Sequence, residues 1–166
     1  MKKILIVLAT TFLLAVSFNA YSADDTYWGA NLGLSTGEES GVDTGFLGSL
    51  FYGATYGEYR FEGEIFRQEN DTDFGADIET MGFLINGYYD FDIDSEWTPY
   101  IGAGIGYGKA EIGSYDDNDF IWQVGAGVSY ELNESTTLDF KYRYYSVEVG
   151  DGYDGHTGLV GIRFKF

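Results

Sequence analysis

Residues 97–108 read Trp-Thr-Pro-Tyr-Ile-Gly-Ala-Gly-Ile-Gly-Tyr-Gly, a stretch in which apolar side chains and glycines alternate. Successive side chains of an extended strand point to opposite faces, so a period of two predicts a β-strand. The strand would present an apolar face and a glycine face, formed by Ile101, Ala103, Ile105 and Tyr107 and by Gly102, Gly104, Gly106 and Gly108.

The same alternation recurs along the rest of the chain and predicts an all-β protein. We expect eight strands, at Tyr27–Ser35, Phe46–Tyr52, Tyr59–Arg67, Thr80–Asp90, Trp97–Gly108, Phe120–Tyr130, Thr136–Ser146 and His156–Phe166. The register of the second strand is ambiguous, although Phe46, Leu50 and Tyr52 can share one face.

The connections between these strands alternate in length. Long acidic loops are expected at Thr36–Thr44, Arg67–Ile78, Lys109–Asp119 and Val147–Gly155, and shorter connections at Gly53–Glu58, Phe91–Glu96 and Glu131–Ser135. Long loops at one end and short turns at the other are typical of an up-and-down transmembrane β-barrel in the outer membrane. Strands one and eight must then pair, because an open sheet edge in hydrocarbon leaves backbone groups without partners.

The chemistry of the two faces predicts which side looks outward. One face carries bulky apolar residues, and the other is small and ionic, which suits lipid outside and a narrow lumen inside. The predicted lumen charge network consists of Arg60, Glu62, Glu64, Asp139, Lys141, Arg143, Arg163 and Lys165. The alternative is a soluble barrel of the lipocalin type, in which the two faces are exchanged.

Aromatic residues cluster at the predicted strand ends. Trp28, Tyr59, Tyr89, Trp97, Tyr130 and Phe166 lie nearest the short turns, and Tyr107, Trp122 and Tyr144 lie near the long loops. Two aromatic girdles are expected where amphipathic rings settle at the membrane interfaces.

The N-terminus predicts export. Lys2 and Lys3 precede an apolar run from Ile4 to Phe18, and small residues follow it, so residues 1–22 are interpreted as a signal peptide. Cleavage is expected after Ser22, with Ala23 as the second choice, which leaves residues 23–166 as one barrel domain. The alternative is a membrane anchor, for which the run is too short.

The composition restricts the class of partner. The 166-residue chain has 27 acidic and 9 basic residues, and loss of Lys2 and Lys3 takes the net charge from −18 to −20. Such a surface repels nucleic acid and anionic lipid. An aromatic fraction of 19% argues against disorder, and the absence of cysteine excludes disulfides.

Three stretches resemble one family. Trp97–Tyr107, Phe120–Leu132 and Leu138–Ser146 resemble strands of the outer-membrane β-barrel domain family, which includes opacity-type proteins and outer-membrane protein A, as does the C-terminal stretch Gly161–Phe166. The resemblance implies an integral outer-membrane protein with extracellular loops, in contact with membrane lipid and lipopolysaccharide. It also implies that Phe166 is the last aromatic of a signal read by the barrel-assembly machinery.

The sequence leaves three functions open. The four loops hold fourteen acidic residues and two basic ones, so the first hypothesis is a monomeric, non-enzymatic surface protein that maintains the envelope or binds a cationic host or matrix ligand. The second is a narrow porin. The third is a lipid A-modifying enzyme, because Arg143–Ser146 loosely resembles the active-site strand of lipid A acyl hydrolases. Two observations count against an enzyme. Tyr144 stands at the position of the required histidine, and His156 lies on another strand.

No cofactor or metal is expected. Carboxylates can bind divalent cations, and the loop stretch Asp71–Gly75 superficially resembles a calcium loop. A glycine stands where a third ligand belongs, and Gly82 occupies the position of the closing glutamate.

Overall fold

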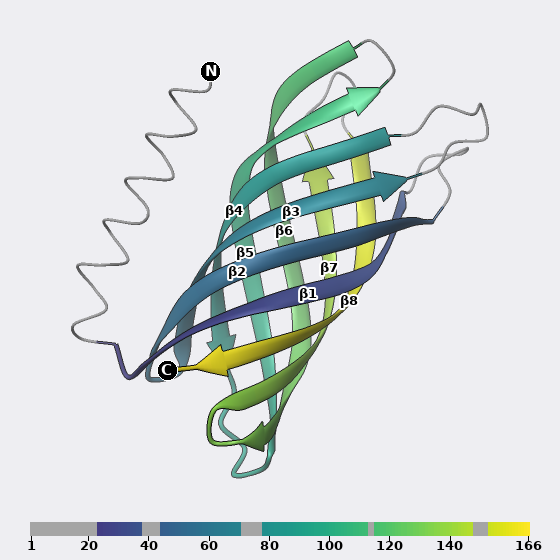
Figure 1. Ribbon diagram of the computed structural model, residues 1–166. Coiled ribbons are helices and arrows are strands. Elements are labelled where there is room, and N and C mark those ends of the chain that lie inside the picture. The colour runs from purple at the N-terminus through teal and green to yellow at the C-terminus, as the bar shows by residue number, and fades with distance from the viewer. Residues whose placement is uncertain (1–22, 38–43, 71–77, 113–114, 148–152) are drawn as a thin grey trace.

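The computed structural model describes residues 23–37, 44–70, 78–112, 115–147 and 153–166 (Figure 1). These residues form eight strands, β1 Asp25–Gly37, β2 Gly45–Tyr56, β3 Tyr59–Asn70, β4 Ile78–Asp90, β5 Trp97–Ile112, β6 Tyr115–Asn133, β7 Thr136–Val147 and β8 Tyr153–Lys165. The predicted signal peptide and parts of the predicted loops lie outside the described residues. Within the described residues, no helix is long and apolar enough to cross a membrane.

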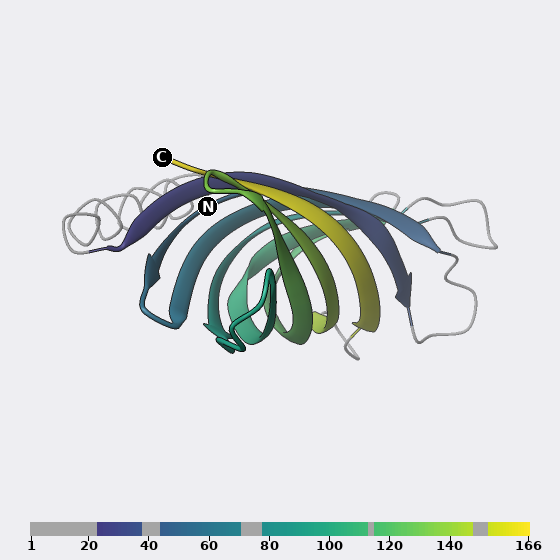
Figure 2. The ribbon, with the colours of Figure 1, turned by 90° about the horizontal axis from the view of Figure 1, so that it is seen from below.

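The strands close into one antiparallel barrel in chain order, as predicted. Closure depends on the pairing of β1 with β8, which runs without interruption from Tyr27↔Lys165 to Gly37↔Gly155. The view from below shows the strands curving around a common interior (Figure 2). We call the end with the β2–β3, β4–β5 and β6–β7 connections the turn end, and the opposite end the loop end.

The predicted long loop at Lys109–Asp119 is wrong. β5 continues to Ile112 and β6 begins at Tyr115, with pairs such as Lys109↔Asn118 and Glu111↔Asp116. Backbone pairing continues here although the alternation of polarity has ended. A polarity pattern marks only the part of a strand whose two faces have different surroundings, and so it misses this extension.

Two predicted turns are also shorter in the structure. β2 extends to Tyr56, so the β2–β3 connection is a two-residue turn at Gly57 and Glu58, and Gly57 has a positive φ of 59°. The left-handed region favours glycine, because this residue has no Cβ to clash. β6 extends to Asn133, next to an irregularity in its pairing with β7 at Glu131 and Asn133.

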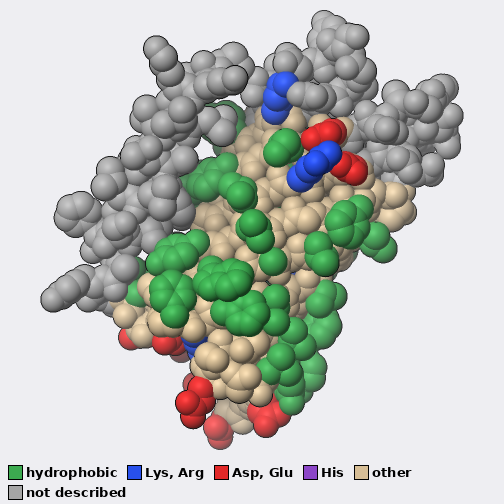
Figure 3. Space-filling view, in the orientation of Figure 1, with side chains coloured by type: hydrophobic (Ala, Val, Ile, Leu, Met, Phe, Trp, Pro, Cys, Tyr) green, Lys and Arg blue, Asp and Glu red, His purple; other side chains and the backbone are tan. Residues whose placement is uncertain are grey.

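The large apolar side chains point outward. Leu34 is 60% exposed, Ile65 57% and Ile105 56%, whereas Arg60, Glu62 and Glu64 of β3 are buried inside. Apolar side chains cover much of the flank of the barrel in Figure 3. This is the predicted orientation, and it is the opposite of that in a soluble lipocalin-like barrel.

Inward glycines of β5 make room for large side chains of the neighbouring strands. A Cβ added to Gly102 would lie 2.3 Å from Cδ1 of the buried Tyr88 ring. That ring cannot retreat easily, because its hydroxyl accepts a 2.9 Å hydrogen bond from Lys141 and its face lies 4.8 Å from the Arg60 guanidinium. The absence of a side chain at Gly102 is therefore a packing requirement.

Gly102→Ala is expected to lower the free energy of unfolding by about 1–3 kcal/mol, the usual cost of overpacking a filled interior. Tryptophan fluorescence during urea unfolding of the vesicle-inserted barrel measures the effect. Gly48→Ala is the matched control, because its Cβ would point outward and lie 3.7 Å from the nearest atom. Equal stability of the two variants would contradict the packing argument.

Candidate functional site

The structure places the eight residues of the predicted lumen charge network on the inner face. Seven of them are 0–8% exposed, namely Arg60, Glu62, Glu64, Asp139, Lys141, Arg143 and Arg163. The side chain of the eighth, Lys165, is 28% exposed at the turn end, 3.5 Å from Asp25 and 3.7 Å from Glu131.

The first cluster of polar contacts joins β6, β7 and β8 near the turn end. Arg163 Nε donates to Asp139 Oδ2 at 2.7 Å, and Arg163 Nη2 donates to Ser129 Oγ at 2.8 Å. Ser129 in turn donates to Asp139 Oδ1 at 2.7 Å. Both carboxylate oxygens of Asp139 are thus hydrogen-bonded, which a buried charge requires.

A second cluster surrounds Arg60. Its Nε donates to Asp90 at 2.6 Å and its Nη1 lies 3.3 Å from Glu62, which also accepts a hydrogen bond from the Tyr27 hydroxyl. The guanidinium carbon lies 4.8 Å from the Tyr88 ring centre and 4.7 Å from the Tyr100 ring centre. Aromatic faces stabilise a cation at such distances, so two tyrosines complete the surroundings of this arginine.

The third cluster lies towards the middle of the barrel. Arg143 Nη1 lies 3.2 Å from Glu64 Oε1, and Asn86 donates to Glu64 Oε2 at 2.8 Å. Gln123 donates to Asn86 at 2.7 Å. Together with the partly exposed Asp90, the inward charges comprise four cations and four carboxylates, so the described lumen is close to neutral.

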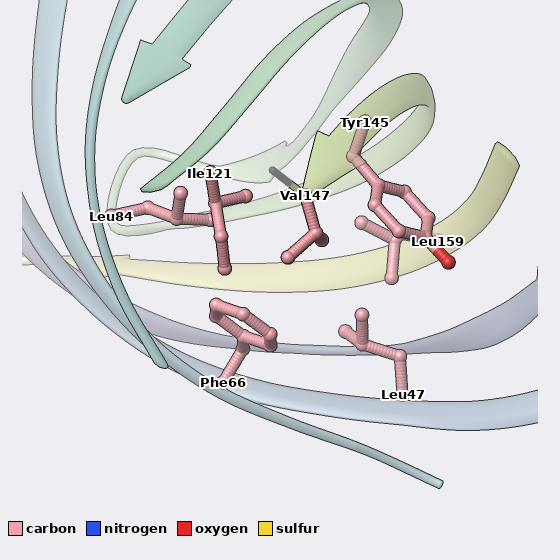
Figure 4. Close-up of a cluster of buried hydrophobic side chains, with 7 residues drawn as sticks. All are labelled: Leu47, Phe66, Leu84, Ile121, Tyr145, Val147 and Leu159. Atoms are coloured by element: carbon pink, nitrogen blue, oxygen red, sulfur yellow. The ribbon is translucent and has the colours of Figure 1, made fainter. Parts of the chain in front are cut away.

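The loop-end half of the lumen has a different character, which the sequence analysis missed. Seven buried side chains pack against one another there: Leu47, Phe66, Leu84, Ile121, Tyr145, Val147 and Leu159 (Figure 4). We call this group the apolar plug. The expectation that the inward face is only small and ionic is therefore wrong for this half of the barrel.

The apolar plug leaves little space beside the charged clusters. A cavity of about 20 Å³, lined by Leu84, Ile121, Gln123 and Arg143 among others, lies between them. That volume holds about one water molecule. The sequence did contain a signal for the apolar plug. Each of its residues occupies an inward position in the period-two alternation of its strand, as the predicted lumen charges do.

The eight predicted girdle residues, Trp28, Tyr59, Tyr89, Trp97, Tyr107, Trp122, Tyr130 and Tyr144, all lie on the outer face. Six of them form cross-strand pairs, with ring centres 5.3 Å apart for Tyr59–Tyr89, 4.6 Å for Trp97–Tyr130 and 5.6 Å for Trp122–Tyr144. Trp28 packs on Phe164 at 4.9 Å and Tyr107 on Phe120 at 5.8 Å.

Phe166 follows the last strand and is 73% exposed. Its backbone N–H donates to Thr26 O at 3.1 Å, and its ring centre lies 6.2 Å from that of Tyr52. Its role as an assembly signal stays a prediction.

Of the residues considered for an enzyme, Tyr144, Ser146 and His156 lie on the outer face of β7 and β8, whereas Arg143 points into the lumen. Tyr144 pairs directly with His156, and Ser146 pairs with Asp154. The His156 ring stacks on Tyr142 and its Nδ1 lies 2.6 Å from the Tyr142 hydroxyl.

In the part of the chain that the structure describes, no group of three or more histidines and carboxylates could hold a metal ion. The Asp71–Gly75 stretch lies outside that part.

A family model described as "outer membrane protein beta-barrel domain" matches residues 5–166. Outer membrane protein PagN of Salmonella typhimurium is 31% identical over 108 residues, which cover 48% of this chain and 45% of that protein. Outer membrane protein X of Escherichia coli K12 is 32% identical over 81 residues, which cover 43% of this chain and 44% of that protein. The chain thus spans less than half the length of these relatives.

Solved structures share the architecture. Neisserial surface protein A has a TM-score of 0.74 and 27% identity, with 85% of this chain and 97% of that chain covered. Ail, the attachment invasion locus protein of Yersinia pestis, has a TM-score of 0.56 and 18% identity, with 86% and 97% covered. The outer membrane enzyme PagL has a TM-score of 0.59 and 17% identity, with 81% and 97% covered. The last two show likeness of fold alone.

Arg143→Met is expected to lower the free energy of unfolding by about 3–5 kcal/mol, because it leaves the buried Glu64 carboxylate without its ion pair. Urea unfolding in lipid vesicles measures the loss. The double variant Arg143→Met with Glu64→Gln should recover part of it, since no unpaired charge then remains.

The control is Arg67→Met, because Arg67 pairs with Glu79 at 3.1 Å on the outside and its side chain is 55% exposed. Exposed pairs contribute little. A loss at Arg143 no larger than that at Arg67 would contradict the role assigned to the buried pair.

Proposed function

The chain belongs to the outer membrane protein beta-barrel domain family, and we propose that it is a surface-interaction protein whose loops bind a cationic partner while its barrel stays closed. It is an outer-membrane protein with an eight-stranded barrel. The proposal takes the loop end to face the outside of the cell, after export by the signal peptide predicted at residues 1–22.

The filled lumen is the observation that carries the proposal. Buried ion pairs occupy the turn-end half and the apolar plug occupies the loop-end half. An eight-stranded barrel is only wide enough to be filled by its own side chains. Since the described part of the lumen holds no wide path, we take the loops and rims as the surfaces that interact with other molecules.

The sequence of the loops favours a cationic partner. Fourteen acidic residues stand against Arg67 and Lys109 in the four stretches at the loop end, including the extended part of the β5–β6 hairpin, so we expect this end to attract basic proteins and repel polyanions. Ail has been solved with the heparin analogue sucrose octasulfate, a polyanion. That ligand class does not suit the acidic loops of this chain, so we propose basic host or matrix proteins instead.

A role in envelope integrity is compatible with the same arrangement, because a closed barrel in contact with lipid and lipopolysaccharide adds to the outer membrane without opening it.

We propose a monomer inserted by the barrel-assembly machinery, with Phe166 as the terminal aromatic of the signal. Neither proposal requires a cofactor or a catalytic group.

Binding of a fluorescent oligolysine to intact cells tests the loop proposal, measured as the excess over cells that lack the protein. The triple variant Asp71→Asn, Asp73→Asn and Asp77→Asn is expected to lower this excess severalfold, and added salt should do the same. The control makes an equal charge change at the turn end, Asp92→Asn, Asp94→Asn and Glu134→Gln. Equal binding by the loop variant and the unaltered protein would overturn the proposal.

Single-channel recording in planar bilayers tests the closed lumen against the narrow-porin alternative. The purified protein is expected to give no steady current under conditions in which a large porin conducts. A steady current that changes with Arg143→Gln would favour the porin, because Arg143 lines a cavity of about 20 Å³ in the described lumen.

A further inference from the structure

Two neighbouring hairpins repeat one arrangement on the outer face at the turn end. In the first, the Tyr89 hydroxyl of β4 donates to Glu58 Oε2 at 2.7 Å, and the Tyr89 ring lies 5.3 Å from that of Tyr59. In the second, the Tyr130 hydroxyl of β6 donates to Glu96 Oε2 at 3.1 Å, and its ring lies 4.6 Å from that of Trp97.

The backbone repeats along with the side chains. The Glu58 carbonyl accepts a hydrogen bond from Asp90 N at 2.8 Å, and the Glu96 carbonyl accepts one from Glu131 N at 3.1 Å. In each case a glutamate directly precedes a strand that begins with an aromatic residue, and a tyrosine followed by an acid lies at or near the end of the partner strand. We call these two groups the aromatic–carboxylate sites: Glu58, Tyr59 and Tyr89, and Glu96, Trp97 and Tyr130.

Both sites lie where the apolar flank gives way to the acidic rim of the turn end. Tyr59 is 54% exposed and Trp97 45%, and the next outward strand residues include Phe61 at 52%. Figure 3 shows apolar side chains on the flank and acidic side chains below them at this end. A lipid headgroup occupies this height when the apolar flank is immersed in hydrocarbon.

The two carboxylates are not paired with a cation among the described residues at this boundary. Among the described residues, the ion pairs at this end join Arg60 to Asp90 and Lys165 to Asp25 and Glu131, and none joins a lysine or arginine to Glu58 or Glu96. Each is held by a neutral phenol hydroxyl, which fixes the carboxylate beside an aromatic pair without neutralising it. A carboxylate beside exposed aromatic faces is the chemistry that recognises an ammonium ion.

We propose that the two aromatic–carboxylate sites bind the primary ammonium headgroups of phospholipids in the leaflet at the turn end. The ammonium donates to the carboxylate and contacts the aromatic faces, and the acyl chains continue along the apolar flank. Anionic glycerol headgroups are repelled by the same carboxylates. Choline headgroups keep the attraction to the aromatic rings but have no N–H to donate.

Native mass spectrometry of the full mature protein, released from vesicles with equal ethanolamine and glycerol phospholipids, tests the proposal. The protein should retain ethanolamine phospholipid several times more often than glycerol phospholipid, and vesicles with choline phospholipid should give an intermediate result. The double variant Glu58→Gln with Glu96→Gln keeps both hydrogen-bond acceptors and removes both charges, and it should lose most of this preference.

The control is Glu134→Gln with Asp92→Asn, which makes the same charge change on the same rim without touching the aromatic pairs, and it should keep the preference. Heat-modifiable gel mobility establishes that each variant is folded. Trp97→Leu gives a second test, because it keeps the apolar contact and removes the aromatic face, and it should weaken ethanolamine binding. An unaltered preference in the Glu58→Gln, Glu96→Gln protein, or an equal loss in the control, would overturn the proposal.

Discussion

The pairing of β1 with β8 is the constraint on which the rest of this structure depends. A bilayer offers no water to hydrogen-bond a backbone amide, so a sheet that crosses it must have no open edge. Eight strands are enough to close the sheet, but they enclose a space that only side chains can fill. From that point the inward residues pack as a protein core does, and the outward residues act as a surface for lipid.

The interior meets this packing requirement in two ways along its length. From the turn end to the middle of the barrel, four cations and four carboxylates balance one another. Such pairs are expensive to break and contribute little over an apolar core when intact. Near the loop end, the apolar plug fills the space without polar groups. Together they fill the described lumen, which is why we propose that the protein interacts through its loops and rims.

The outside of the barrel also differs between its two ends. Arg67, one of the two basic residues of the loop stretches, pairs with Glu79 on the outer face at the loop end. At the turn end, tyrosine hydroxyls bond to the carboxylates of Glu58 and Glu96. The two leaflets therefore meet different chemistry, and the outer surface is more than a uniform apolar belt.

The strand count, the orientation of both faces and the inward set of charges could all be predicted from the sequence alone. Alternation with a period of two can be recognised within a single strand, without knowing which strands lie beside it. It could not supply the partners: Arg143 and Glu64 lie 79 residues apart and meet only because the barrel closes. The packing of the apolar plug was hidden for the same reason, since parity points Leu47 and Phe66 inward but only closure brings them against one another. The extended β5–β6 hairpin was hidden because its polarity no longer alternates, although its backbone pairing continues. Local pattern decides which way a side chain points, and tertiary closure decides what it meets.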